Sequence, residues 1–232
     1  KLQTVEEDSA IGMDVGDVGD DESTAQGLER PAWIKNLETN CLKWLELLPS
    51  TVLDPLPKNQ DSLKNPLYRF FDREISIGRE LMRKVKHDIQ NLISCCRGEL
   101  KQSNYLRTLM TNLTKGVIPK AWKVYAVTDA ATLNSWFIDF TQRIKQLQLI
   151  REQQLSGAKD MRVWLGGLFN PEAFITATRQ RAARSRQWSL ENLELSIVFD
   201  GAADSEGTSF VVEGLTLQGA SLRDNKLQLS AD

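Results

Sequence analysis

The chain has 232 residues, of which 41% are hydrophobic and 26% are charged, and its formal net charge at pH 7 is -2. This length suits one large domain or a domain with an appendage, and no apolar run reaches the roughly 18 residues that a membrane-spanning helix needs. The composition therefore predicts a soluble globular protein and excludes membrane insertion.

The near-neutral total conceals two regions of opposite charge. Residues 1–27 contain eight acidic residues and one basic residue, a net charge of -7, so the remaining residues carry +5. Glycine and acidic residues dominate this first region, and its isolated valines have no periodicity that could be buried. We therefore expect a disordered acidic tail over 1–27.

The next region, residues 28–157, has the periodicity of helices. Apolar residues spaced by three and four predict a helix over 32–48, followed by a loop over 49–66 that holds four of the seven prolines. Two further helices are expected, one from Ser103 to Gly116 and one from Asp129 to just before Gly157.

A long helix is predicted between residues 65 and 98. Asn65–Pro66 has the order of an N-cap and a first helical residue, and Gly98 is a typical helix end. The apolar stripe between them is interrupted at coiled-coil seam positions by Glu74, Gly78 and Asp88. Packing inside a helical bundle is therefore favoured over a coiled coil.

The pattern changes in residues 158–232. The glycine-rich stretch 163–169 predicts a buried strand or an extended turn. After Trp188 apolar residues alternate with polar ones, which predicts strands separated by turns at Asp200–Gly201 and Asp224–Asn225. The expected fold class is α+β, a mainly α-helical bundle followed by a small, incomplete antiparallel β-sheet or barrel.

The region also holds a helix rich in arginine, predicted over 171–187 behind the start signal Asn170–Pro171. Its arginines are Arg179, Arg181, Arg184 and Arg186. At 100° per residue the first and last lie on one side, and the other two lie nearly opposite. Since phosphate binding needs several cations on one face, we expect no nucleic-acid partner and instead expect salt bridges or a solvated face.

The sequence offers few residues for catalysis or metal binding. It has one histidine and three cysteines, Cys41, Cys95 and Cys96, without metal-ligand spacing, and it lacks the glycine-rich phosphate-binding motifs. We expect no catalytic, cofactor-binding or metal-binding residue in this segment, and free thiols.

The stretch 166–180, GGLFNPEAFITATRQ, resembles the signature near the C-terminus of dynein heavy chains. Three further segments agree in the same order: NPLYRFFDRE at 65–74, KGVIPKAW at 115–122 and RIKQL at 143–147. Together the resemblance covers most of residues 32–230 and leaves the acidic tail without a counterpart. The signature residues are Gly166, Gly167, Phe169, Pro171, Glu172, Thr176, Arg179 and Gln180.

The resemblance implies a position within a dynein heavy chain. Residues 28–157 resemble the end of the sixth and last AAA module and the start of the C-terminal domain, and residues 158–232 resemble the rest of that domain. Long cytoplasmic members continue past the strand at 227–230 to complete a small β-barrel, so the barrel here is expected to be partial.

The resemblance also implies a function. The segment would be a non-catalytic regulatory domain that packs on the AAA+ ring of the same heavy chain and tunes an ATP-driven, minus-end-directed microtubule motor in the cytoplasm and cytoskeleton. ATP and magnesium would act in the parent motor, whose partners are microtubules and dynein accessory chains. The four arginines of the helix over 171–187 are candidate contacts with the ring. The alternative is a free-standing helical protein–protein interaction module.

Overall fold

The computed structural model of the protein describes residues 30–50, 53–125, 131–156, 162–193, 210–213, 220–223 and 226–229. The predicted acidic tail over 1–27 and the predicted turn at Asp200–Gly201 lie outside the described residues. From Ala32 onward the protein forms one unit. None of the helices in the described ranges is long and apolar enough to cross a membrane.

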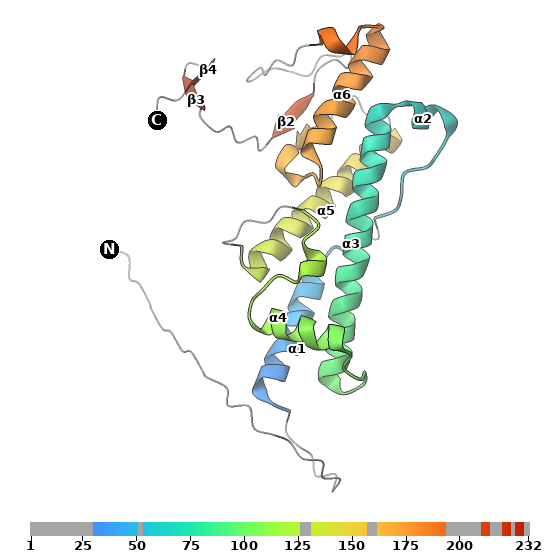
Figure 1. Cartoon of the computed structure of the whole chain (residues 1–232). Coiled ribbons are helices and arrows are strands. Elements are labelled where there is room, and N and C mark those ends of the chain that lie inside the picture. Colours follow the sequence, from blue (N-terminus) through green and yellow to red (C-terminus); the bar gives the residue numbers. More distant parts are fainter. Residues whose placement is uncertain are drawn as a thin grey trace, which may run out of the picture. The chain divides into compact units, whose positions relative to one another are not determined.

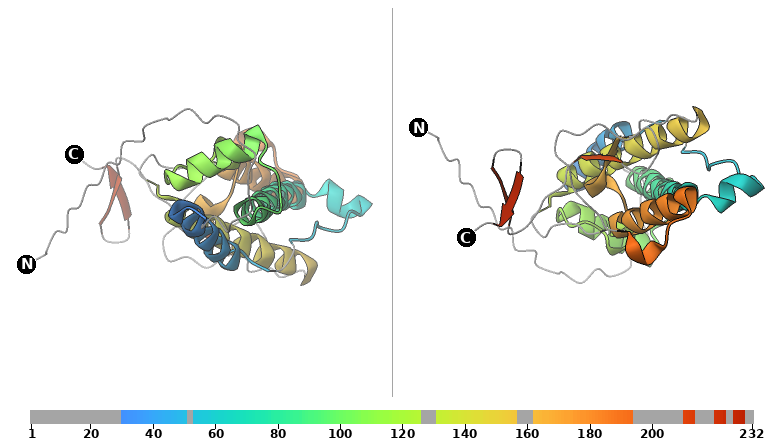
Figure 2. Two further views of the ribbon diagram at one scale, coloured as in Figure 1. Left: turned by 90° about the horizontal axis from the view of Figure 1, so that it is seen from below. Right: turned by 90° about the horizontal axis from the view of Figure 1, so that it is seen from above.

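One long helix, α3, is the element on which the others pack (Figure 1). It spans Pro66–Arg97, and it contacts α1 (Ala32–Leu47), α4 (Asn104–Thr114), α5 (Leu133–Ser156) and α6 (Pro171–Arg186). In the end-on views of Figure 2, the short helix α2 lies on the side of α3 away from α1. The described helices therefore form the predicted bundle around α3.

Both ends of α3 lie where the sequence predicts them. The Asn65 side-chain oxygen accepts hydrogen bonds from the backbone N–H groups of Leu67 at 3.0 Å and Tyr68 at 3.4 Å. At the other end Gly98 has a φ of 81° and donates its N–H to the carbonyl of Cys95. These caps satisfy backbone groups that the helix itself leaves unpaired, so the predicted boundaries are confirmed.

The starts of α4 and α5 also depend on side-chain caps. The Ser103 hydroxyl accepts the N–H of Leu106 at 3.2 Å, as the sequence predicts. Helix α5, in contrast, begins at Leu133 and not at the predicted Asp129. The hydroxyl of Thr132 accepts the N–H of Ser135 at 3.2 Å, so this threonine caps the helix.

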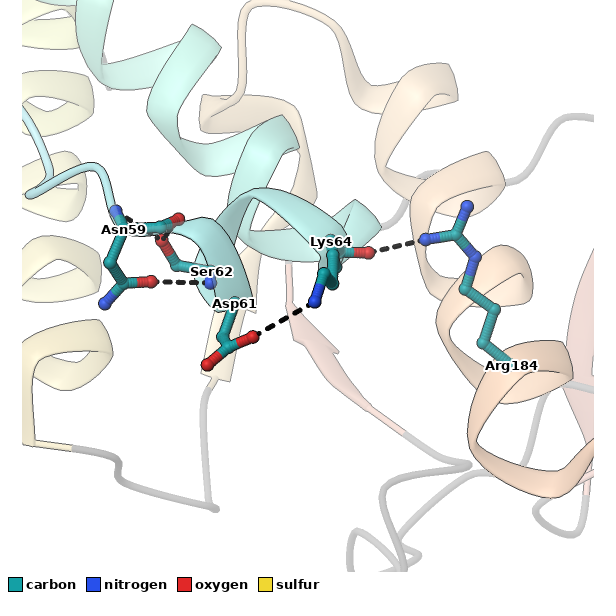
Figure 3. A network of polar contacts seen from close by, with 5 residues as sticks. All are labelled: Asn59, Asp61, Ser62, Lys64 and Arg184. Atoms are coloured by element: carbon teal, nitrogen blue, oxygen red, sulfur yellow. Dashed lines mark hydrogen bonds and ion pairs between the residues drawn. The ribbon is translucent and has the colours of Figure 1, made fainter.

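A short helix, α2 (Gln60–Lys64), lies within the stretch that we expected to be only a loop. A capping box starts it, because Asn59 accepts the N–H of Ser62 at 2.6 Å and donates its own N–H to the Ser62 hydroxyl at 3.2 Å (Figure 3). The four prolines in residues 49–66 favour a loop, so the sequence analysis did not predict this short helix.

The strands form two separate pairs. The stretch predicted as a strand or turn is β1 (Arg162–Trp164) followed by the 3₁₀ turn η2 (Leu165–Gly167), and β1 pairs with β2 (Val211–Glu213). This pair is parallel, which corrects the expected antiparallel sheet. Since α6 lies between the two strands in sequence, the backbone crosses over before pairing, and such a connection allows a parallel pair.

The second pair is antiparallel, as expected. Strand β3 (Ala220–Arg223) pairs with β4 (Lys226–Leu229), with Arg223 opposite Lys226. These two residues flank the predicted turn at Asp224–Asn225, which itself lies outside the described residues. The described strands form no closed barrel, and the α+β class is confirmed.

The core of the bundle is rich in stacked aromatic rings. The ring centroids of Trp122 and Trp136 lie 5.4 Å apart, those of Trp136 and Phe140 lie 5.1 Å apart, and those of Trp44 and Phe137 lie 5.1 Å apart. All five side chains are buried. These contacts join α1, η1 (Lys120–Trp122) and α5 into one core.

Helices α3 and α5 approach closely at Gly78. A Cβ atom at this position would lie 2.6 Å from a methyl carbon of Leu147 and 3.3 Å from Ile144 and Phe169. Real Cβ atoms do not tolerate the shorter distance without movement of the neighbour. The close approach of the two helices therefore leaves no room for a larger side chain here unless these buried side chains move.

Replacement of Gly78 by leucine should consequently destabilise the fold. We expect Gly78→Leu to lower the free energy of unfolding by about 2–3 kcal/mol in urea denaturation, because the added side chain overpacks the α3–α5 contact. Arg83→Leu, at an exposed position of the same helix, is the matched control and should change it by less than about 0.5 kcal/mol. Equal losses in the two variants would contradict this role of Gly78.

Candidate interaction site

A fully buried carboxylate, that of Glu74, holds the segment that leads into α6. One carboxylate oxygen accepts the N–H of Phe169 at 2.6 Å, and the other accepts the N–H and the side-chain amide of Asn170, each at 3.0 Å. The exposed fraction of Glu74 is 0%. Three donors therefore replace part of the water that this carboxylate loses on burial.

These bonds correct the expected role of Asn170. The sequence places this residue at the N-cap of α6, yet its side chain makes no hydrogen bond to the start of that helix. Its side-chain NH₂ group donates to Glu74 instead, because the buried carboxylate needs donors to replace water, and this bond holds the amide in a position where its oxygen does not cap the helix. Pro171 still occupies the first helical position, as predicted.

A cation holds the same segment through its carbonyl group. Arg143 of α5 donates to the carbonyl of Leu168 at 3.0 Å and to the carboxylate of Asp139 at 2.7 Å, and its exposed fraction is 8%. Its guanidinium lies over the ring of Tyr125, 4.1 Å from the centroid. Opposite charges on α3 and α5 thus bind neighbouring peptide groups of one segment.

A third side chain, the amide of Gln146, pairs with the backbone of β1. The Trp164 N–H donates to the Gln146 side-chain oxygen at 2.7 Å, and the Gln146 amide donates to the Trp164 carbonyl at 3.1 Å. This is how a neighbouring strand would pair with this residue. We call Glu74, Arg143, Gln146 and the segment 164–170 the Glu74 junction.

Burial raises the pKa of three ionisable groups inside the bundle, those of Glu74, Tyr125 and Cys41. It raises the pKa of Glu74 above the ordinary value of 4.5, although the N–H groups of Phe169 and Asn170 and the charge of Arg143 act in the opposite direction. Burial likewise raises the pKa of Tyr125, and it raises the pKa of Cys41 to about 12, which keeps that thiol protonated near neutral pH.

The structure divides the predicted signature residues into two sets. The first set is packed or bonded inside the domain: Gly167, Phe169, Pro171 and Arg179. Gly167 lies against the ring of Trp164, where a Cβ atom would overlap the ring carbons. The second set is exposed: Gly166, Glu172, Thr176 and Gln180. The last three are spaced by four, so they share the solvent side of α6.

The four arginines of α6 contact four different parts of the protein. Arg179 donates to the carbonyls of Leu190 and Leu193, in and just after η3 (Leu190–Asn192), and Arg184 donates to the carbonyl of Lys64 at the end of α2 (Figure 3). Arg181 lies over the ring of Phe210 at 5.6 Å, and Arg186 lies over that of Trp188 at 5.8 Å. They do not form one basic face.

Sequence reasoning missed Glu74 and Asp88, which it treated only as interruptions of an apolar stripe. Asp88 has an exposed fraction of 2% and accepts hydrogen bonds from the Tyr105 hydroxyl and the Trp122 indole N–H, both at 2.8 Å, and it pairs with Lys84 at 3.4 Å. An acid inside a buried stripe needs hydrogen-bond donors from other elements. The presence of acidic residues in the apolar stripe of α3 was therefore the signal that could have identified Glu74 and Asp88.

The comparisons with known proteins confirm the resemblance to dynein heavy chains. The family model for the C-terminal domain of dynein heavy chains matches residues 7–232. The protein is 40% identical to a cytoplasmic dynein heavy chain of Drosophila melanogaster over its whole length, 44% identical to that of Dictyostelium discoideum over 82% of its length, and 39% identical to that of Caenorhabditis elegans over 86%.

Two consequences follow from the extent of these matches. The family model and the Drosophila match reach into residues 1–27, so the expectation that the acidic tail has no counterpart was wrong. The sequence spans only 4–5% of the length of these relatives.

Replacement of Glu74 by glutamine should weaken the junction without changing its shape. The glutamine NH₂ group would face an N–H donor, so we expect Glu74→Gln to lower the free energy of unfolding by about 2 kcal/mol. Glu80→Gln, at an exposed position of α3, should have almost no effect. If both variants melt at the wild-type temperature, Glu74 does not stabilise the segment.

The stability difference between the wild type and this variant should also depend on pH. Because burial raises the pKa of Glu74, the folded state keeps this proton at a higher pH than the unfolded state. The group's contribution to stability is therefore fully present below 4.5, the ordinary value, and is lost as the pH rises through the raised pKa. The loss caused by Glu74→Gln should then be larger near about pH 5 than near about pH 7 in urea denaturation. The opposite trend would mean that the three hydrogen bonds outweigh burial.

Proposed function

The protein belongs to the family of dynein heavy chains, as their C-terminal domain, and from this membership we propose that it is a non-catalytic regulatory domain of an ATP-driven microtubule motor. In this proposal it packs on the AAA+ ring of its own heavy chain and tunes the minus-end-directed movement of the motor. ATP, magnesium, microtubules and the dynein accessory chains act on other parts of that heavy chain, in the cytoplasm and cytoskeleton.

The observation that carries the proposal is the match over nearly the whole sequence. Relatives named as cytoplasmic dynein heavy chains are 39–44% identical to it over 82–100% of its length. Since the sequence spans about one twentieth of those relatives, its activity is best understood as an influence on a much larger machine.

The chemistry of the buried charges supports a structural role for these residues. The carboxylates of Glu74 and Asp88 accept hydrogen bonds from backbone or aromatic donors, and Arg143 donates to a carbonyl and a carboxylate. Each of these groups holds elements of the bundle together.

We propose α6 as the element that contacts the ring. Its solvent side carries Glu172, Thr176 and Gln180, and its inner side is held by the Glu74 junction. A guanidinium has five N–H donors, so Arg179, Arg181, Arg184 and Arg186 retain donors for a second partner beside their contacts within the domain.

The alternative function is a free-standing helical protein–protein interaction module. The two differ in where the partner comes from, because a regulatory domain acts on its own heavy chain. Removal of the region from the motor separates them.

The test compares the complete motor with one that lacks the region corresponding to residues 32–232. We expect deletion to change ATPase rate or run length, and we expect Glu172→Lys/Gln180→Glu in the complete motor to change them in the same direction but less. Lys43→Glu/Lys145→Glu, at exposed positions of α1 and α5, is the control and should behave as the wild type. If the deletion leaves both quantities unchanged, the regulatory function is wrong.

A further inference from the structure

Helix α6 ends in a segment that is open to solvent and carries a serine. Every residue from Arg184 to Asn192 is exposed, except Arg186, which is half-buried. Ser189 lies between the end of α6 and η3, and its backbone is extended, with a φ of -68° and a ψ of 131°. Its side chain does not cap η3. The hydroxyl of Ser189 is therefore accessible to an enzyme.

Basic and apolar side chains flank this hydroxyl in a regular order. Arg184 and Arg186 stand five and three residues before Ser189, and Leu190, whose exposed fraction is 42%, follows it directly. Protein kinases that select basic substrates present carboxylates to arginines at these positions, because a guanidinium binds a carboxylate through two parallel hydrogen bonds. The order of residues is that of a substrate for such a kinase.

The last turn of α6 is strained. Gln187 is the only described residue other than glycine whose φ is in the left-handed region, at 57°, where a Cβ atom is unfavourable. The backbone N–H groups of Gln187 and Trp188 both donate to one carbonyl, that of Ala183. Opening of this turn breaks few hydrogen bonds and relieves the strain, so the residues before Ser189 can extend into a kinase cleft.

Both arginines make contacts at the surface. Arg184 donates to the carbonyl of Lys64 (Figure 3), and the guanidinium of Arg186 lies 5.8 Å from the ring centroid of Trp188. The exposed fraction of Trp188 is 52%. Water or a carboxylate can replace such partners at an exposed site with little loss of free energy, so both guanidinium groups can turn toward a kinase.

Only one other serine or threonine of the described residues follows a basic residue by three positions. It is Ser76, which follows Arg73. Ser76 is half-buried well inside α3. Its backbone cannot extend unless the helix on which the bundle packs is broken. Ser76 is therefore an internal comparison in which the basic residue is present and the accessible backbone is not.

We propose that Ser189 is a phosphorylation site for a protein kinase that selects arginines before the serine. The Ser189 oxygen forms a bond to the γ-phosphorus of ATP, the bond from that phosphorus to the β–γ bridging oxygen breaks, ADP leaves, and the hydroxyl proton passes to the catalytic carboxylate of the kinase. The phosphate brings a charge of about -2 to the end of α6, which offsets Arg184 and Arg186. This inference does not depend on a contact between α6 and the ring.

The test uses the 232-residue protein, ATP with magnesium, and the catalytic domain of a kinase that selects arginine at the fifth and third positions before the serine. Tandem mass spectrometry should locate phosphate on Ser189 and none on Ser76. Ser189→Ala should remove the labelling by this kinase.

Two variants test how the kinase selects the site. Arg186→Ala should lower kcat/KM for phosphorylation about tenfold or more, and Arg184→Ala should lower it about threefold or more, because each removes a charge-assisted pair with the kinase. Arg73→Ala, at an exposed position of α3, is the matched control and should be phosphorylated as the wild type. Melting temperatures check that each variant folds.

A third variant tests the strain at Gln187. Gln187→Gly relieves the strain without opening the turn, since glycine adopts a positive φ readily. It should stabilise the end of α6 and lower kcat/KM about fivefold in the folded protein. In a free peptide that spans residues 182–193, the same substitution should have almost no effect, because the peptide has no helix to open.

Several outcomes would overturn the proposal. Phosphorylation of the free peptide but not of the protein would mean that the end of α6 stays closed to the kinase. Failure of both to react, labelling of Ser76 at the rate of Ser189, or a wild-type rate for Arg186→Ala would mean that the arginines do not select this serine.

Discussion

The arrangement of this domain depends on the burial of one carboxylate, that of Glu74, in the middle of a helix bundle. Such a group costs several kcal/mol unless donors replace its water, and here two consecutive backbone N–H groups and one amide do so. Arg143 holds the carbonyl one residue earlier in the same segment. These bonds hold the segment 168–170 in place directly before Pro171, the first residue of α6.

Helix α3 repeats this principle along its length. Glu74 holds the segment before α6, Gly78 admits α5, and Asp88 binds the side chains of Tyr105 in α4 and Trp122 in η1. Apolar contacts between these helices allow many relative positions of similar energy, whereas a hydrogen bond or a missing Cβ atom allows few. Glu74, Gly78 and Asp88 thus specify which element packs at each position along α3. The apolar residues around them supply most of the stabilisation.

The elements that the sequence predicts correctly are those whose signals are local. Asn65, Ser103 and Gly98 act within a few residues of themselves, and so the ends of α3 and the start of α4 follow from the sequence. Tertiary partners decide the features that were missed. The side chain of Asn170 turns from its own helix toward Glu74, and β1 finds a parallel partner almost 50 residues later. Of the candidate site, the sequence identifies the segment 166–180 but not Glu74, since nothing local shows which donors a buried acid will receive.

Two buried acids of α3 hold different elements of the bundle. Glu74, which binds the segment before α6, and Asp88, which binds Tyr105 of α4 and Trp122 of η1, are 14 residues apart on α3, which corresponds to about 21 Å along its axis. The two acids share no hydrogen-bond partner among these residues, so each holds its own element without the other. If a contact at α6 altered the packing of α4, α3 would be the element to carry the coupling, because it packs on both.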